Sequence, residues 1–134
     1  KLHVTSGFVA LERGGRESIV PAGAMCLTRK GKRLGTPFSA ESSEKFRAAL
    51  EQFDFAAGGA RALQIVLDSR NSYDIITLWH LLPRVSLADR TKVFDALAAY
   101  VQPPASVTRD GVMKLNKVML AEWRESVEAA WWEQ

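Results

Sequence analysis

The chain has 134 residues, of which 47% are hydrophobic, 9% are aromatic and 25% are charged, and its formal net charge is +3. This composition predicts one compact domain, or two small ones that share an interface, and it excludes a chain that is mainly disordered. Lysine and arginine residues are scattered among aspartate and glutamate, a pattern that gives little support to a nucleic-acid partner. No apolar run approaches the ~20 residues that cross a bilayer.

The first quarter of the chain carries strand and turn signals. Gly14 and Gly15 supply the positive φ angles that a hairpin turn needs, Pro21 with Gly23 marks a second turn, and Gly31 marks a third. We therefore predict a short antiparallel β region over residues 1–36. Its predicted strands are Phe8–Leu11, Ser18–Val20, Ala24–Thr28 and Lys32–Leu34. So few strands are stable only if another element covers their apolar face.

From Ser39 onward the apolar residues recur with the period of a helix. Ser39 or Ser42 is expected to cap the first helix, and Ser86 is expected to cap a later one. The predicted helices are 39–53, 60–68, 73–82, one from Leu87 to about Val101 and 117–131, with a small hairpin between Val107–Thr108 and Val112–Met113. The predicted fold class is α+β, with a β domain over 1–36 and a bundle of about five α-helices over 37–134.

Residues with catalytic or metal-binding chemistry are few. His3 and His80 are the only histidines, and the positions three and four residues from His80 hold no partner for metal binding or proton transfer. Cys26 has no second cysteine and is expected to be a buried small hydrophobic residue. No phosphate-binding glycine loop, nucleophile motif or calcium loop occurs. We therefore predict a non-enzymatic protein that uses no cofactor and no metal.

A group of cations is the first candidate binding site. Arg29, Lys30, Lys32 and Arg33 surround Gly31 in a predicted hairpin, which could act as a wing against a phosphate backbone. A DNA-binding helical domain with this basic hairpin is therefore an alternative function. Such turns are more often solvated loops that protect a sheet edge, so no nucleic-acid partner is expected.

The tryptophans near the C-terminus are the second candidate. Trp123, Val127 and Trp131 share one helix face, which predicts that they dock the last helix on the body. Trp132 is rotated by about 100° from Trp131 and is expected to be exposed, where it could anchor a protein partner. A generic protein-interaction domain is thus a further alternative.

Two short elements carry a resemblance to a known family. In the FecR-type periplasmic domain, a "G-x-V-x-V" strand is followed by a turn and an "L-x-A-G" segment, and residues 7–11 and 20–23 of this chain resemble these closing strands. The matching residues are Gly7, Val9 and Leu11 in the first element and Val20, Ala22 and Gly23 in the second. The segments 78–85, 93–104 and 107–112 look like a helical extension found in some FecR-like proteins of soil bacteria.

The resemblance implies a membrane-anchored regulator that relays an envelope signal to an extracytoplasmic-function sigma factor. Its partners would be the signalling domain of an outer-membrane transporter or the sigma-factor system. The sigma-binding segment, the membrane helix and the opening strands of the FecR-type domain are not in this sequence. The chain is therefore expected to be the periplasmic portion of an inner-membrane-anchored protein. Its exposed sheet edge is expected to pair with another chain, including a second copy, or to be covered by the helix after Ser39.

Overall fold

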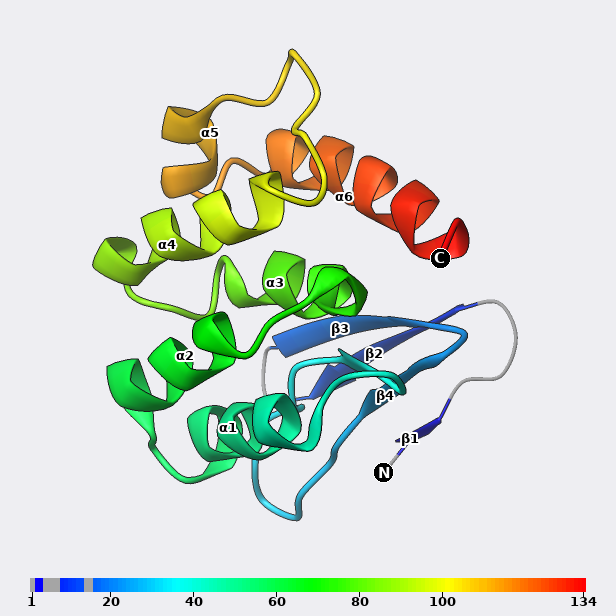
Figure 1. The fold of residues 1–134 in the computed structure, drawn as a ribbon, viewed down its shortest axis with the longest axis vertical. Helices are drawn as coiled ribbons and strands as arrows, with labels where there is room; N and C mark the ends of the chain where they lie inside the picture. Colours follow the sequence, from blue (N-terminus) through cyan, green and yellow to red (C-terminus); the bar gives the residue numbers. More distant parts are fainter. Residues whose placement is uncertain (1, 4–7, 14–15) are drawn as a thin grey trace. The chain divides into compact units, whose positions relative to one another are not determined.

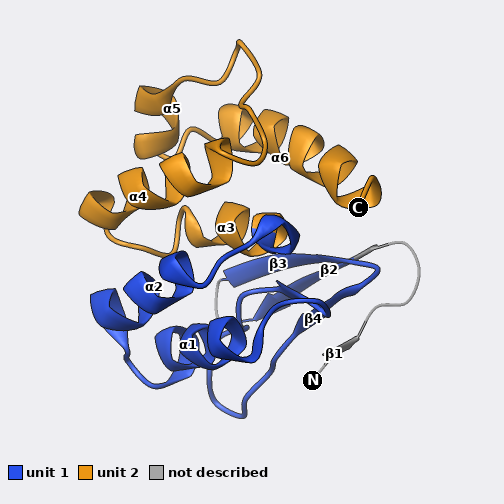
Figure 2. Cartoon of the chain, viewed as in Figure 1, with its two compact units in different colours: residues 1–74 blue, residues 75–134 orange. Residues whose placement is uncertain are grey.

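The computed structural model describes residues 2–3, 8–13 and 16–134 and has an α+β fold, as the sequence predicts. The chain divides into two compact units, residues 1–74 and residues 75–134 (Figure 2). All the strands belong to the first unit, which we call unit 1, together with two helices (Figure 1). The second, which we call unit 2, is helical among its described residues.

Unit 1 contains two small antiparallel sheets. One is the predicted hairpin, in which Val9 lies opposite Val20. The turn predicted at residues 14–15 lies outside the described residues. The other has the strand order β1-β4-β5 and pairs Met25 with Phe38. The strands are β1 (Leu2–His3), β2 (Phe8–Arg13), β3 (Arg16–Pro21), β4 (Ala24–Cys26) and β5 (Phe38–Ser39).

The strand predicted at Lys32–Leu34 is wrong, and β5 takes its place in the sheet. Gly31 has a φ of 74°, and the Lys32 amide donates to the Arg29 carbonyl at 3.0 Å, so the chain makes a β-turn there without a ladder after it. The chain runs on as a loop and rejoins β4 only at Phe38.

Two α-helices follow the strands in unit 1. Helix α1 (Glu44–Phe55) begins after Ser43, whose hydroxyl accepts the Phe46 amide at 3.1 Å. The sequence pattern suggested Ser39 or Ser42 as the cap, but the capping residue is Ser43. Helix α2 (Gly59–Asp68) packs beside α1, and a 3₁₀ turn, η1 (Ser72–Asp74), ends the unit (Figure 1).

The division of the chain at 74/75 differs from the predicted boundary at 36/37. Helix α1 is bound to the loop after β4 by hydrogen bonds, because Asp54 accepts the Thr36 amide at 2.7 Å and Arg47 donates to the Ala40 carbonyl. The change from strand to helix composition, on which the prediction depended, therefore does not mark a structural boundary.

Unit 2 is built on an apolar interior between four helices. These are α3 (Ile75–Leu81), α4 (Leu87–Ala98), α5 (Arg109–Met113) and α6 (Lys117–Trp132). Helix α3 packs against α4 and α6, and α5 packs against α4 and α6. The fully enclosed side chains include Leu78, Leu81, Leu82, Val93, Leu97, Val112, Trp123 and Val127. Trp131 is also buried, so the predicted inward face of the last helix is confirmed.

The hairpin predicted around Asp110-Gly111 is wrong, because these residues form α5. Thr108 caps this helix by accepting the Gly111 amide at 3.0 Å. A Cβ atom on Gly111 would lie 2.0 Å from the Met119 sulfur, so a glycine allows α5 to approach α6 closely. Close helix packing, which a local turn signal does not reveal, explains this glycine.

Candidate protein-binding pocket

His80 is enclosed in unit 2, with 3% of its surface exposed. Its Nδ1 lies 2.8 Å from the Ile76 carbonyl, one helical turn away, and its ring contacts the edge of Trp79. Burial, helped by the positive charges of Arg84 and Arg124, lowers the pKa of His80 to about 3, while the Ile76 carbonyl opposes this shift. His80 is therefore a neutral interior residue at physiological pH.

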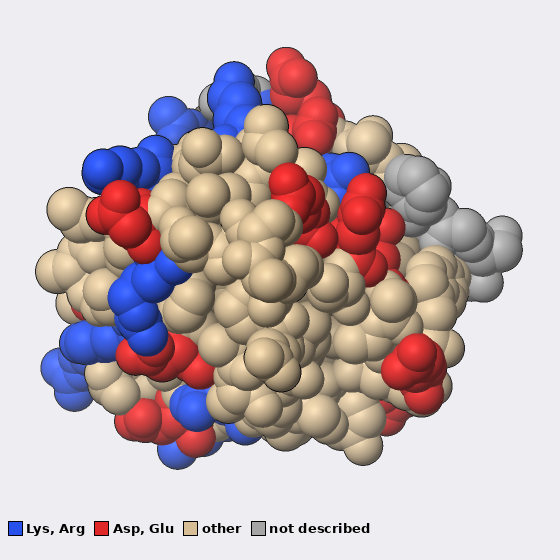
Figure 3. Space-filling model, turned by 90° about the horizontal axis from the view of Figure 1, so that it is seen from above, with Lys and Arg blue, Asp and Glu red and all other residues tan. Residues whose placement is uncertain are grey.

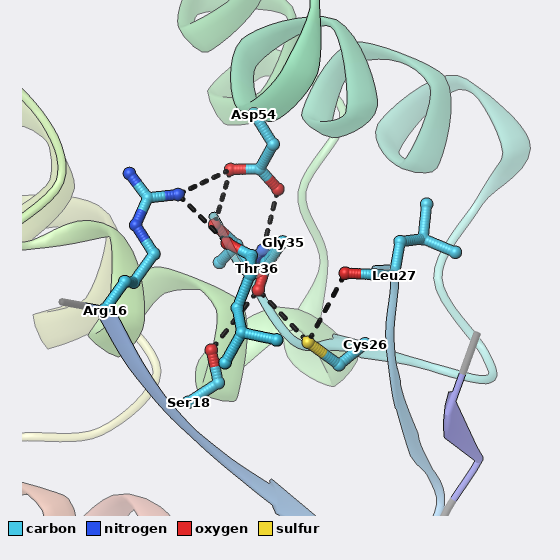
Figure 4. Close-up of polar contacts among 8 residues, drawn as sticks. Arg16, Ser18, Cys26, Leu27, Gly35, Thr36 and Asp54 are labelled. Atoms are coloured by element: carbon cyan, nitrogen blue, oxygen red, sulfur yellow. Dashed lines mark hydrogen bonds and ion pairs between the residues drawn. The ribbon is translucent and has the colours of Figure 1, made fainter. Parts of the chain in front are cut away.

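Ser18 and Cys26 converge on one backbone carbonyl in unit 1 (Figure 4). The Ser18 hydroxyl donates to the Gly35 carbonyl at 3.3 Å, and the Cys26 thiol lies 3.1 Å from the same oxygen. Cys26 is completely buried, as predicted for a small hydrophobic residue. These contacts fix the loop after β4 against β3 and β4.

The carboxylate of Asp54 holds the next part of the same loop (Figure 4). It accepts the Thr36 amide at 2.7 Å and the Thr36 hydroxyl at 2.8 Å, and Arg16 lies 3.8 Å away. Arg16 also donates to the Leu34 carbonyl at 3.1 Å. Burial lowers the pKa of Arg16 and nearby Arg33 adds to this, whereas Asp54 opposes it. Asp54 therefore binds α1 to the loop and to β3. We call this set of contacts of Asp54 with Thr36 and Arg16 the latch.

Asp74 is a second buried carboxylate in unit 1. It accepts the Ser42 hydroxyl at 2.5 Å and the Asn71 amide at 2.8 Å. Burial raises the pKa of Asp74, and these two hydrogen bonds oppose that shift. The carboxylate connects Ser42, two residues before α1, with Asn71, which directly precedes η1.

The latched loop and α1 enclose a pocket of about 300 Å³, which we call the α1 pocket. Its apolar wall is formed by Leu27, Phe38, Ala48 and Leu50. The polar side chains that line it are Thr36, Glu44, Arg47, Glu51 and Asp54. An apolar cavity of this size with a few polar groups is typical of a binding site for one large side chain or a small molecule.

Arg47 crosses the α1 pocket. Its guanidinium lies 5.6 Å from the centre of the Phe38 ring, and one of its terminal nitrogens donates to the Ala40 carbonyl. Its Nε is shielded from water and has no hydrogen-bond partner in the structure. A buried N–H without an acceptor costs free energy, so this arginine makes the pocket wall less stable than a fully paired side chain would.

The predicted basic residues lie at the base and tip of the loop beside this pocket. Arg29 forms an ion pair with Glu51 of the pocket wall, and its guanidinium lies over the Phe55 ring. Lys30, Lys32 and Arg33 are exposed. The structure thus brings Arg29 to the pocket and leaves the other three cations facing water.

Trp132 lies in unit 2 and is 55% exposed, whereas Trp131 is buried, as the helical spacing predicts. Trp79 is only partly buried, and its indole N–H donates to the Leu120 carbonyl at 3.0 Å.

Figure 3 shows basic and acidic side chains next to one another around an uncharged middle of the face that it draws. That surface offers no continuous positive stripe for a phosphate backbone.

No family model matches the chain, and no curated protein or solved structure matches it. Among the described residues, no helix is long and apolar enough to cross a membrane. The same part of the chain contains no group of three or more His, Cys, Asp or Glu side chains arranged to hold a metal ion.

The sequence pattern does not point to the α1 pocket or to Arg47 in its lining. The available signal was the position of Arg47 directly after the buried Phe46, which places the stem of the arginine at the border of the apolar face of α1. The opposite wall could not be found in this way, because Leu27 and Phe38 belong to a loop and a two-residue strand.

Proposed function

We propose that this chain is the protein-binding part of a FecR-like envelope regulator and that it acts through protein contacts and not through catalysis. The observation that carries the proposal is the α1 pocket, which combines an apolar wall with charged side chains around it. The residues that could do chemistry have other roles: Cys26, Asp54 and His80 make hydrogen bonds inside the fold.

The FecR-like part of the proposal rests on the resemblance of two short segments, most of whose residues lie in or beside described strands. Val9 and Leu11 lie in β2, Val20 lies in β3, and Ala22 with Gly23 forms the turn into β4. Gly23 has a φ of 87°, which explains why a glycine occupies the last position of the matching segment. Gly7 lies outside the described residues.

In this proposal the chain is periplasmic and connected to an inner-membrane anchor that lies upstream in the full-length protein. The signal is passed to an extracytoplasmic-function sigma factor through a protein partner, such as the signalling domain of an outer-membrane transporter.

The experiment uses the full-length protein in its own host. Reporter fusions on both sides of the upstream segment establish the topology, and a promoter read by the neighbouring sigma factor reports signalling. We expect one upstream membrane span, a periplasmic location for this chain, and a reporter response that is lost when the chain is deleted. A cytoplasmic full-length protein without a span would refute the proposal.

A further inference from the structure

The two ends of the α1 pocket carry opposite charge. Glu44 and Asp54 are ten residues apart on α1, which corresponds to about 15 Å along the helix axis. At the Glu44 end the carboxylate is exposed and forms no ion pair with any residue that the structure describes. This end can therefore pair with a cation from a ligand.

The Asp54 end is bordered by the basic turn. The Gly35 amide donates to the Leu27 carbonyl at 3.0 Å and closes the base of the loop that carries the exposed Lys30, Lys32 and Arg33. Leu27 and Thr36, which adjoin this base, both line the pocket. Glu51 and Asp54 are already compensated by Arg29 and Arg16. The net charge offered to a ligand at this end is therefore positive.

Between the ends lies the apolar wall. An apolar side chain of a ligand can fill the space next to Leu27, Phe38 and Leu50. An extended chain rises about 3.3 Å per residue, so about five residues would span the pocket from end to end.

From this arrangement we infer that the α1 pocket binds an extended segment of a partner protein in which an apolar anchor separates an acidic residue from a basic one. The acidic residue lies toward the basic turn and the basic residue lies toward Glu44. The inference rests on the proposed protein-binding function and specifies the chemistry of the partner. A nucleic-acid strand fits less well, because the exposed Glu44 at one end of the pocket would repel its phosphates.

The test measures binding of fluorescent synthetic peptides to the purified chain by fluorescence anisotropy. Each peptide has blocked ends and a central leucine or phenylalanine, flanked by one acidic and one basic residue in either backbone order. The controls carry two acidic flanks, two basic flanks, or a glycine in place of the anchor. We expect the better mixed peptide to bind about fivefold more tightly than either like-charged control. The glycine control should bind about tenfold more weakly than the mixed peptide.

Variants of the chain identify the site. Ala48→Trp should fill the pocket and weaken binding about tenfold, whereas Ala60→Trp, on an exposed position of α2 that does not line the pocket, should not. Glu44→Lys should transfer the preference to the peptide with two acidic flanks. Lys45→Glu changes the charge at the next position of α1, outside the pocket, and is the control for Glu44→Lys. Circular dichroism verifies that each variant is folded.

The outcomes separate this inference from the proposed function. Equal binding of mixed and like-charged peptides, no binding of any peptide, or unchanged preference in Glu44→Lys would overturn the peptide inference, even if the sigma-factor reporter responds as expected. Selective peptide binding combined with a cytoplasmic, span-free full-length protein would leave the pocket inference standing and refute the FecR-like role.

Discussion

Unit 1 and unit 2 are stabilised in different ways. In unit 1 the loop between β4 and β5 is positioned by polar bonds to its backbone, above all from Asp54, Ser18 and Cys26. In unit 2 Arg90 likewise donates to the Leu82, Val85 and Met113 carbonyls, but large apolar side chains fill the interior between the helices. Among them, Trp123 donates its indole N–H to the Val101 carbonyl from a fully buried position. Hydrogen bonds can hold a loop without filling the space beside it, and the α1 pocket is the result.

The largest expected effect lies in the core of unit 2. Trp123→Ala removes a side chain with no exposed surface and a ring whose centre lies 5.0 Å from that of Phe94. We expect a loss of about 3–5 kcal/mol in the free energy of unfolding, from the cavity and from the orphaned Val101 carbonyl. Urea denaturation followed by circular dichroism measures it, and hydrogen exchange shows whether α3 and α6 lose more protection than α1.

Trp123→Phe is the matched control, since it keeps a ring against Phe94 but removes the N–H donor. Its loss should be clearly smaller than that of Trp123→Ala. Equal losses for the two variants would show that the hydrogen bond, and not the apolar packing, dominates at this position, and the contrast between the units would disappear.

The next effect concerns the latch of unit 1. Asp54→Ala leaves the Thr36 amide and hydroxyl without their acceptor and removes the counter-charge of the half-buried Arg16. We expect a loss of about 2–4 kcal/mol in the free energy of unfolding. Thr36→Val removes only the hydroxyl donor and should cost less, and the double variant should cost less than the sum of both. Additive losses would contradict a shared latch.

The elements that the sequence predicts well are those with local signals. The apolar periods of α1, α2, α4 and α6 identify their buried faces, and the β2–β3 hairpin follows from its alternating runs. The separation of Trp131 from Trp132 depends only on the angle between neighbouring residues of a helix, which explains why it was predictable.

The elements that the sequence does not reveal depend on contacts between distant residues. The partners of Asp54, Thr36 and Arg16, lie 18 and 38 positions away from it in the chain. Strand β5 has only two residues, and its pairing with β4 decides its conformation. The pocket unites a loop, a strand and a helix, and no single segment carries its pattern.

Lowering the pH should change the stability of the two units in opposite directions, because the pKa of His80 in unit 2 is lowered and the pKa of Asp74 in unit 1 is raised. The unfolded chain protonates His80 near pH 6.5, whereas the folded chain keeps it neutral down to about pH 3. Falling pH therefore favours unfolding of unit 2, by about 2 kcal/mol between pH 7 and pH 5. Asp74 has a raised pKa in unit 1, so its contribution to stability is present at low pH and is lost as pH rises through that pKa.

Urea denaturation at pH 7 and pH 5 measures this dependence in the natural chain, in His80→Gln and in Asp74→Asn. His80→Gln should abolish most of the loss between pH 7 and pH 5, while hydrogen exchange locates the remaining loss. Asp74→Asn should leave the His80 effect intact. If His80→Gln retains the full pH dependence, then His80 is not the group that titrates.

The smallest effects on stability are expected at two exposed ion pairs, one in each unit. In both, an arginine pairs with a carboxylate and also lies over an aromatic ring. Arg29 pairs with Glu51 and lies 5.3 Å from the centre of the Phe55 ring, and Arg109 pairs with Asp95 and lies 4.6 Å from that of Phe94. Both arginines are about half exposed. Arg29→Gln and Arg109→Gln should therefore each change the free energy of unfolding by less than about 1 kcal/mol.

Peptide binding should nevertheless distinguish the two variants. Arg29→Gln leaves Glu51 uncompensated in the wall of the α1 pocket, which makes the end near the basic turn more negative and should weaken the mixed-charge peptide about threefold. Arg109→Gln changes an equivalent pair in the unit without that pocket and should leave peptide affinity unchanged. Equal affinities for the two variants would mean that the charge of Glu51 does not affect peptide binding. The opposite charges assigned to the two ends of the pocket would then be wrong.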